Sequence, residues 1–178
     1  MLFPKNDVVK IKYYTADVSS RPPDNRQGDR QKAYLTALSQ LPKVEIIKGH
    51  FLGPKVVRMP LCDENGLYQG RTVTVLKTEE KGSDVNLAVD LLHDCVQDRY
   101  ECAIVVSNDS DILSPIRIVR RDYGKKIGLA SPHTRPSLQL SQNVDFRIRV
   151  TETALSASQL PETIAFGNRQ ISRPTEWR

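Results

Sequence analysis

The chain has 178 residues, 39% of them hydrophobic and 26% charged, which suits one globular domain with a single core. No window approaches the roughly 18 consecutive apolar residues of a membrane span, and the start lacks the apolar core of a secretory signal. We therefore expect a cytoplasmic protein with no membrane partner. Three cysteines without CxxC spacing and three scattered histidines exclude a disulfide framework, a zinc ribbon and a zincin.

Charge is distributed unevenly along the chain. Residues 1–60 carry 11 basic and 5 acidic side chains, residues 61–112 carry 4 and 11, and residues 113–178 carry 11 and 5. An acidic centre that gathers a divalent cation, between basic flanks that attract a phosphodiester, would give this pattern. Ordinary solvated surfaces would give it too, so charge alone does not decide between them.

The first part of the chain predicts a strand, a helix and a second strand. β-Branched and aromatic residues at 8–14 predict a strand that runs into a polar loop. Apolar residues spaced among charges predict a helix over 29–40, and 44–51 predicts the second strand. Residues 53–71 lack clear periodicity and predict a loop or short hairpin, with 72–76 extended.

The strongest helix signal begins at Ser83. Its apolar residues recur at i, i+3/i+4 and i+7, and we expect Asp90, Asp94 and Asp98 to face outward. The following segment, 102–107, is a continuous apolar run, which is typical of a strand buried on both faces of a parallel sheet.

Another helix and strand complete the regular pattern. Apolar positions over 112–123 predict a helix that ends at a glycine, and 126–130 predicts a strand. Strands alternating with helices predict an α/β fold, a three-layer, doubly wound and mostly parallel sheet. We expect this domain to occupy residues 1–150, and residues 151–178 to form a C-terminal arm that lies over it or is partly loose.

An acidic turn follows the apolar strand. Asp109 and Asp111 are two residues apart where a parallel strand ends, which is where α/β sheets bind ligands. Asp84, at the start of the strong helix, would join them if that helix packs beside the strand. Close carboxylates are tolerated chiefly when a cation joins them, and Mg²⁺ is the natural one. These residues could instead only cap their helices, so both readings stay open at this point.

Three segments together resemble one family. Glu80 to Leu92 (EKGSDVNLAVDLL), Ala103 to Asp111 (AIVVSNDSD) and Gly124 to Ile127 (GKKI) are similar to the NYN domain family, which is LabA-like, formerly DUF88, and a branch of the PIN-like nucleases. Tyr13–Ala16, Arg30–Leu35 and the final Arg173–Trp177 also resemble stand-alone bacterial members.

The resemblance implies a Mg²⁺- or Mn²⁺-dependent ribonuclease-like site acting on RNA, most simply single-stranded. On that analogy Asp84, Asp109 and Asp111 are the catalytic metal ligands, and Asp90 is solvated or acts behind them. The expected nucleic-acid contacts are Lys81, Ser107, Asn108, Arg117, Arg120 and Arg121, although a solvated helix face would also explain these arginines. Self-association of the chain stays open.

One feature departs from the family pattern. Members begin with an apolar strand that ends in a metal-binding aspartate, whereas the matching part here starts at what would be the second strand. We expect the central strand's backbone pairing and one metal ligand to be missing, either through truncation or with the other strands re-paired. Asp17, just past the first predicted strand, could partly substitute for that ligand.

Two other functions are weighed against the ribonuclease. A non-catalytic module that binds RNA or protein would keep the acidic turn but lose a competent metal site. A Rossmann-like binder of small nucleotides would need a GxGxxG motif after a strand, and no predicted strand has one.

Overall fold

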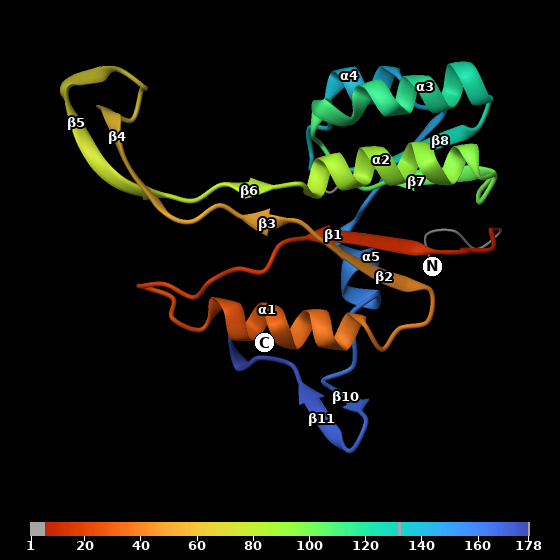
Figure 1. The fold of residues 1–178 in the computed structure, drawn as a ribbon, viewed down its shortest axis with the longest axis horizontal. Coiled ribbons are helices and arrows are strands. Elements are labelled where there is room, and N and C mark those ends of the chain that lie inside the picture. Colours follow the sequence, from red (N-terminus) through yellow and green to blue (C-terminus); the bar gives the residue numbers. More distant parts are fainter. Residues whose placement is uncertain (1–5, 132, 178) are drawn as a thin grey trace.

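The computed structural model describes residues 6–131 and 133–177 as a mixed α/β protein (Figure 1). The elements up to the second long helix are β1 (Ile11–Thr15), α1 (Gln27–Leu38), β2 (Val44–Lys48), β3 (His50–Phe51), β4 (Lys55–Cys62), β5 (Tyr68–Lys77), β6 (Glu80–Lys81) and α2 (Ser83–Val96). Those that follow are β7 (Cys102–Val105), η1 (Ser110–Ile112), α3 (Leu113–Tyr123), β8 (Lys126–Ser131), α4 (Leu138–Gln142), β9 (Phe146–Arg149), α5 (Glu152–Ala157), β10 (Thr163–Phe166), β11 (Arg169–Ser172) and η2 (Thr175–Trp177).

The core lies between α2, α3 and the sheet β7–β8–β9, whose strands are all parallel. Ile116 and Val119 of α3 are fully buried and belong to one apolar cluster with Ile127 and Leu129 of β8. Burying an aliphatic side chain of this size contributes about 1.5–3 kcal/mol. This cluster therefore holds the second half of the chain together, as the apolar periodicity of 83–130 predicts.

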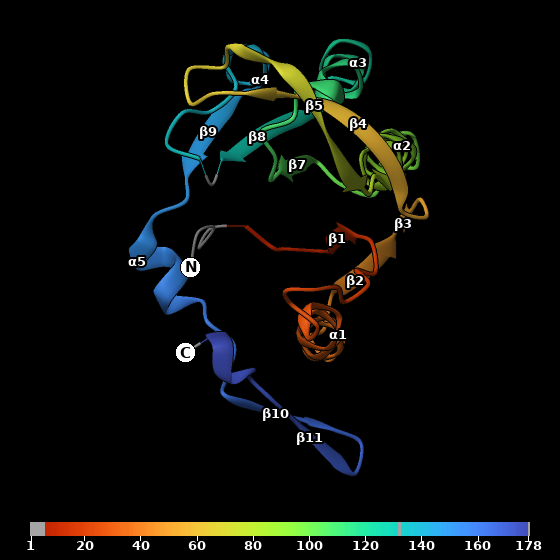
Figure 2. The ribbon, with the colours of Figure 1, turned by 90° about the vertical axis from the view of Figure 1, so that its left-hand side faces the viewer.

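The first half forms a second, separate sheet. β1 and β2 pair in parallel from Ile11 opposite Val44 to Thr15 opposite Lys48, with α1 as the connection between them. Within residues 6–131 and 133–177 no ladder joins β1 to β7. In Figure 2, β7 lies in the upper half of the molecule and β1 lies below it. The expected continuous doubly wound sheet is therefore not present in this structure, which has several small sheets instead.

Side chains of α2 bridge the two halves. Lys12 of β1 lies 2.6 Å from the Asp94 carboxylate and 3.4 Å from that of Asp90, and the Tyr14 hydroxyl donates to Asp90 at 3.0 Å. The expectation that Asp90 and Asp94 face outward is wrong, because the Lys12 ammonium and the Tyr14 hydroxyl on β1 bind them. The Lys12 ammonium helps to lower the pKa of Asp94 against the opposing effect of burial.

The segment from Lys55 to Lys77 is a long hairpin and not a loop or short hairpin. β4 and β5 pair antiparallel, with a bulge between Pro60 and Cys62. The Asp63 side chain accepts hydrogen bonds from the backbone N–H groups of Asn65 and Leu67 and so closes the turn. The hairpin projects away from the body of the molecule (Figure 1), and we call it the β4–β5 arm.

Asp145, just before β9, connects α3 to the sheet through hydrogen bonds. Its carboxylate accepts two hydrogen bonds from the Arg120 guanidinium, at 2.8 and 3.0 Å, and one from the Ile127 backbone N–H at 2.8 Å. Both partners favour the charged form, with Arg120 the larger influence, and they hold the pKa of Asp145 below its usual range.

We expect Asp145→Asn to lower the free energy of unfolding at pH 7 by about 1 kcal/mol, since the charge-assisted pair is lost. Because the folded-state pKa is lowered, this stabilisation is present above the unfolded pKa of about 4 and is lost as the pH falls through the folded value. Urea unfolding between acid and neutral pH measures it. If the difference in free energy of unfolding between variant and parent were the same at acid pH as at pH 7, this account would be contradicted.

The C-terminal segment is ordered and packs on α1. Trp177 lies edge-on to Tyr34 at a ring-centroid distance of 5.9 Å, and Tyr34 lies edge-on to Tyr13 of β1 at 6.1 Å. The β10–β11 hairpin precedes this contact. The end of the chain, with Trp177 of η2, thus contacts α1. Among the described residues, no helix combines the length and apolar character that crossing a bilayer requires.

Candidate functional site

The acidic turn lies directly after β7, at the carboxyl edge of the sheet. Asp109 caps the short helix η1, since its carboxylate accepts a hydrogen bond from the Asp111 backbone N–H at 3.0 Å. The Ser107 hydroxyl accepts one from the Asp109 N–H at 3.0 Å, and the Asn108 side chain accepts one from the Ser137 N–H at 2.6 Å. Ser107 and Asn108 therefore shape the turn, and both aspartates remain exposed.

A second acidic segment forms the start of α2. Gly82 precedes the helix with φ of 98°, a left-handed conformation that favours glycine. The Glu80 carboxylate accepts hydrogen bonds from the Ser83 hydroxyl at 2.8 Å and its backbone N–H at 3.3 Å. Asp84 lies in the first turn, and no side-chain cap is formed at this helix start. Asp109 thus caps its helix by a hydrogen bond, and Asp84 lies in the first turn of α2, where the positive end of the helix dipole favours an anion.

Electrostatics connects the two acidic segments. The pKa of Asp84 is raised, first by partial burial and then by the negative charges of Asp109, Glu80 and Asp111. Carboxylates influence one another in this way only when they are close in space. We call these four residues the acidic edge. The sequence predicted three of them. It missed Glu80, although its place three residues before Ser83 is a usable signal.

The acidic edge has the donor chemistry of a hard cation site, because Mg²⁺ prefers carboxylate oxygens and the mutual repulsion on Asp84 is what a cation relieves. The structure does not form a complete set of metal ligands there, because within residues 6–131 and 133–177 no three Asp, Glu, His or Cys side chains are placed to share one ion. Asp17, the suggested substitute ligand, instead pairs with Lys48 at 2.7 Å.

Removing the charge of Asp84 should stabilise the protein. We expect Asp84→Asn to raise the free energy of unfolding at pH 7 by about 0.5 kcal/mol, a small value because the site is solvated. Since the folded-state pKa is raised, protonation favours the folded state, so the parent regains this stability below the unfolded pKa of about 4. Thermal melts at acid and neutral pH test this. A variant less stable than the parent at pH 7 would show that Asp84 is a structural residue.

The structure places the expected nucleic-acid contacts in different surroundings. Lys81 lies beside the acidic edge and pairs with Glu79 at 3.1 Å. Arg117 of α3 donates to the Asn143 side chain at 2.9 Å, and Arg121 is paired with Asp122. Arg120 is committed to Asp145, and Arg120 and Arg121 lie in the last turn of α3, away from the acidic turn that precedes this helix.

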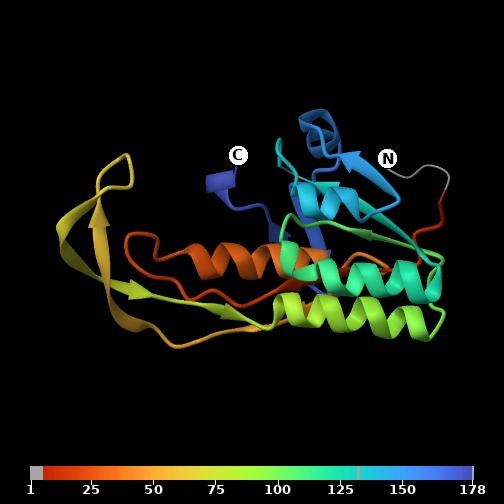
Figure 3. The same cartoon turned by 90° about the horizontal axis from the view of Figure 1, so that it is seen from above.

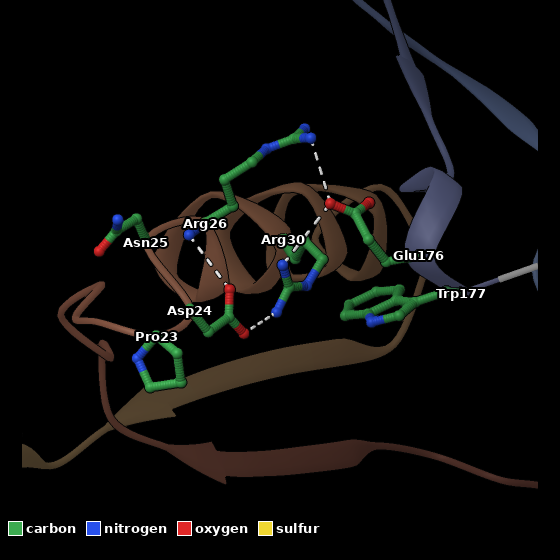
Figure 4. A pocket seen from close by; sticks show the side chains of 7 residues that line it. All are labelled: Pro23, Asp24, Asn25, Arg26, Arg30, Glu176 and Trp177. Atoms are coloured by element: carbon green, nitrogen blue, oxygen red, sulfur yellow. Dashed lines mark hydrogen bonds and ion pairs between the residues drawn. The ribbon is translucent and has the colours of Figure 1, made fainter.

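A separate hollow of about 630 Å³ lies at the start of α1, and Figure 4 shows its lining. Arg26 and Arg30 extend toward Glu176, at 3.1 and 3.7 Å, and Arg30 also pairs with Asp24. Trp177 borders the same hollow. Its cations already have carboxylate partners from the chain itself. We interpret these ion pairs as contacts that hold the C-terminal segment against α1. We therefore place the functional site at the acidic edge and not at this hollow.

Comparison with known proteins gives a family match for most of the chain. Residues 5–148 match the family described as NYN domain. A Pseudomonas putida (strain DSM 28022 / S16) protein named 6-hydroxy-3-succinoylpyridine 3-monooxygenase HspA is 31% identical over 182 residues, which cover 94% of this chain and 57% of that protein. The chain thus spans a little over half the length of this relative.

A solved structure supports the fold. VPA0982 from Vibrio parahaemolyticus RIMD 2210633, a protein of unknown function, superposes with a TM-score of 0.51 at 19% identity, covering 82% of this chain and 71% of that one. With the family match over residues 5–148 and the mixed α/β architecture, the comparisons show that this chain belongs to the NYN domain family, a nuclease-like, PIN-like family.

Proposed function

We propose that this chain hydrolyses RNA phosphodiesters at the acidic edge with the help of Mg²⁺ or Mn²⁺. The observation that carries the proposal is the convergence of negative charge on Asp84 from Asp109, Asp111 and Glu80 at the carboxyl edge of the fold. Two segments of the chain, residues 80–84 and 109–111, contribute to one charged patch there. Stability gives no reason to keep it, because like charges in proximity cost free energy.

Each residue of the edge has a distinct part in the proposal. Asp84, Asp109 and Asp111 would hold the cation, which when bound activates water and stabilises charge on the attacked phosphate. Asn108 ties the turn to Ser137 and so restrains the position of Asp109. Lys81, two residues before the start of α2, would supply positive charge for the phosphate that approaches.

A second candidate, a module that binds RNA without cleaving it, follows from one specific observation. The absence of a finished three-donor cage among the described residues is what a degenerate metal site would look like. The monooxygenase name of the Pseudomonas relative describes a different chemistry, on a protein of which this chain covers 57%. The proposal therefore rests on the acidic edge and the family.

The deciding experiment incubates a labelled generic single-stranded RNA with the protein in Mg²⁺, in Mn²⁺ and in EDTA. The hydrolase is supported by cleavage that requires the metal and is lost in Asp84→Asn. RNA binding in a gel-shift assay, equal with and without metal and without cleavage, supports the second candidate. If the protein neither binds nor cleaves the RNA, both candidate functions are overturned. Asp63→Asn, in the turn of the β4–β5 arm, is the matched control for loss of a carboxylate elsewhere.

A further inference from the structure

The strands of the β4–β5 arm carry positive charge that the chain itself leaves largely unpaired. They contain no acidic residue and four exposed basic ones, namely Lys55, Arg58, Arg71 and Lys77. The acidic residues of the arm, Asp63 and Glu64, are confined to its turn. Among the residues that the structure describes, Lys55, Arg58 and Arg71 form no ion pair. Their charge is therefore available to an anion from outside the chain.

Positive charge continues from the base of the arm to the acidic edge. Lys55 is directly opposite Lys77 in the ladder, and like charges in this position repel one another. A single carboxylate, that of Glu79, lies 2.5 Å from the Lys77 ammonium and 3.1 Å from that of Lys81. It neutralises only part of the charge of these three lysines. Lys81 lies three residues before Asp84, so the line of cations ends at the acidic edge.

The direction of the arm connects the same two places. Helix α2 begins on the side of the molecule from which the arm projects (Figure 3). The tip of the arm bends to the height of α3 and α4, and not toward α1 (Figure 1). Strand β5 spans roughly 33 Å, which is the length of about ten stacked nucleotides. A nucleic-acid strand lying along the arm therefore reaches the acidic edge at its base.

The apolar part of the arm favours a single strand over a duplex. Val56 is directly paired with Leu76, and the two are 71% and 57% exposed. Side chains two residues apart share a face of a strand, so both lie on the same face as Arg58. The bases of single-stranded RNA are free to pack on such a surface, whereas those of a duplex are stacked inside it. Phosphates and bases of one strand thus match the cations and the apolar side chains together.

We propose that the β4–β5 arm binds single-stranded RNA and presents it to the acidic edge, with Lys55, Arg58 and Arg71 contacting its phosphates. Lys77 and Lys81 continue this path to the site, and the turn of the arm lies outside it. The inference rests on the proposed function for the identity of its ligand. It moves the RNA contacts from the arginines of α3, which bind partners within the chain, to the arm.

RNA binding in EDTA tests the arm without any contribution from metal or cleavage. Arg58→Gln combined with Arg71→Gln should raise the dissociation constant for a labelled single-stranded RNA about tenfold or more at about 0.1 M salt. The slope of log affinity against log salt should become shallower by about 1.4, which is about 0.7 for each lost phosphate contact. Lys32→Gln combined with Arg169→Gln removes two exposed cations from α1 and β11 and should change neither quantity.

Cleavage kinetics separate the arm from the proposed hydrolysis. In Mg²⁺ the double arm variant should raise KM and keep kcat, since the arm binds the substrate without touching the reacting bond. Binding through the arm by a parent that does not cleave would overturn the hydrolysis and support the arm. Cleavage by the arm variant with parental KM and parental RNA affinity would support the hydrolysis and overturn the arm.

Three further results would overturn the proposal, with circular dichroism confirming that each variant is folded. The first is an equal loss of RNA affinity in the arm variant and in its control. The second is a loss of affinity with an unchanged salt slope, which would make Arg58 and Arg71 structural residues. The third is parental RNA affinity with an altered mass in light scattering, which would assign the arm to self-association.

Discussion

Asp109→Asn is expected to abolish metal-dependent RNA cleavage while leaving the fold intact. Asparagine keeps a side-chain oxygen to accept the Asp111 N–H, so the cap on η1 survives. What it loses is the negative charge that a divalent cation requires. Replacing a residue that hydrogen-bonds to a metal ligand typically lowers metal affinity or activity about 10- to 100-fold. Losing a direct ligand should therefore lower the cleavage rate by about a hundredfold or more.

The control for this prediction is Asp122→Asn, which removes an aspartate paired with Arg121 at the far end of α3. Cleavage rates of the two variants and the parent, measured on the same RNA in Mg²⁺, should separate Asp109 from its control. Parental activity in Asp109→Asn, with an unchanged melting temperature, would remove the acidic turn from the mechanism.

Ile116→Ala should cause a large loss of stability. Ile116 is completely buried between α3 and the β7–β8–β9 sheet. Truncating an isoleucine there removes buried methyl and methylene groups and leaves a cavity, which costs about 2–5 kcal/mol. In a domain of this size, a loss in the middle of that range lowers the melting temperature by roughly 10 °C.

Leu138→Ala is the matched control, because this aliphatic side chain on α4 is 70% exposed. It should change the melting temperature little, as surface substitutions usually do. Calorimetry or chemical unfolding of both variants checks the prediction. Equal losses for the two would mean that the apolar cluster around α3 does not form the core.

The second half of the fold was predictable because its signals are local. The periodicity of α2, the apolar run of β7 and the glycine after α3 each depend on neighbouring residues alone, and the structure has these elements within two residues of the expected bounds. The strand-edge rule gave the position of Asp109 and Asp111, whereas the proximity of Asp84 was expected only if the helix from Ser83 packs beside the strand from Cys102.

What the sequence did not predict depends on long-range contacts or on broken patterns. Asp90 was expected in solvent because its partner, Tyr14, is 76 residues away. Residues 53–71 were expected to be a loop or a short hairpin because Pro60 and a bulge interrupt the alternation of β4, although Asn65–Gly66 is a strong hairpin signal. The discontinuity between the two sheets is a tertiary property that periodicity does not report.

That discontinuity leaves side chains to connect β1 with α2. Within the described residues, no ladder joins β1–β2 to β7–β8–β9, and β1 is linked to α2 by the ion pairs of Lys12 with Asp90 and Asp94 and by the hydrogen bond from Tyr14 to Asp90. Added salt weakens attractions between partly exposed charges. Because the Lys12, Asp90 and Asp94 side chains are mostly buried, we expect physiological salt to weaken this link between β1 and α2 only slightly.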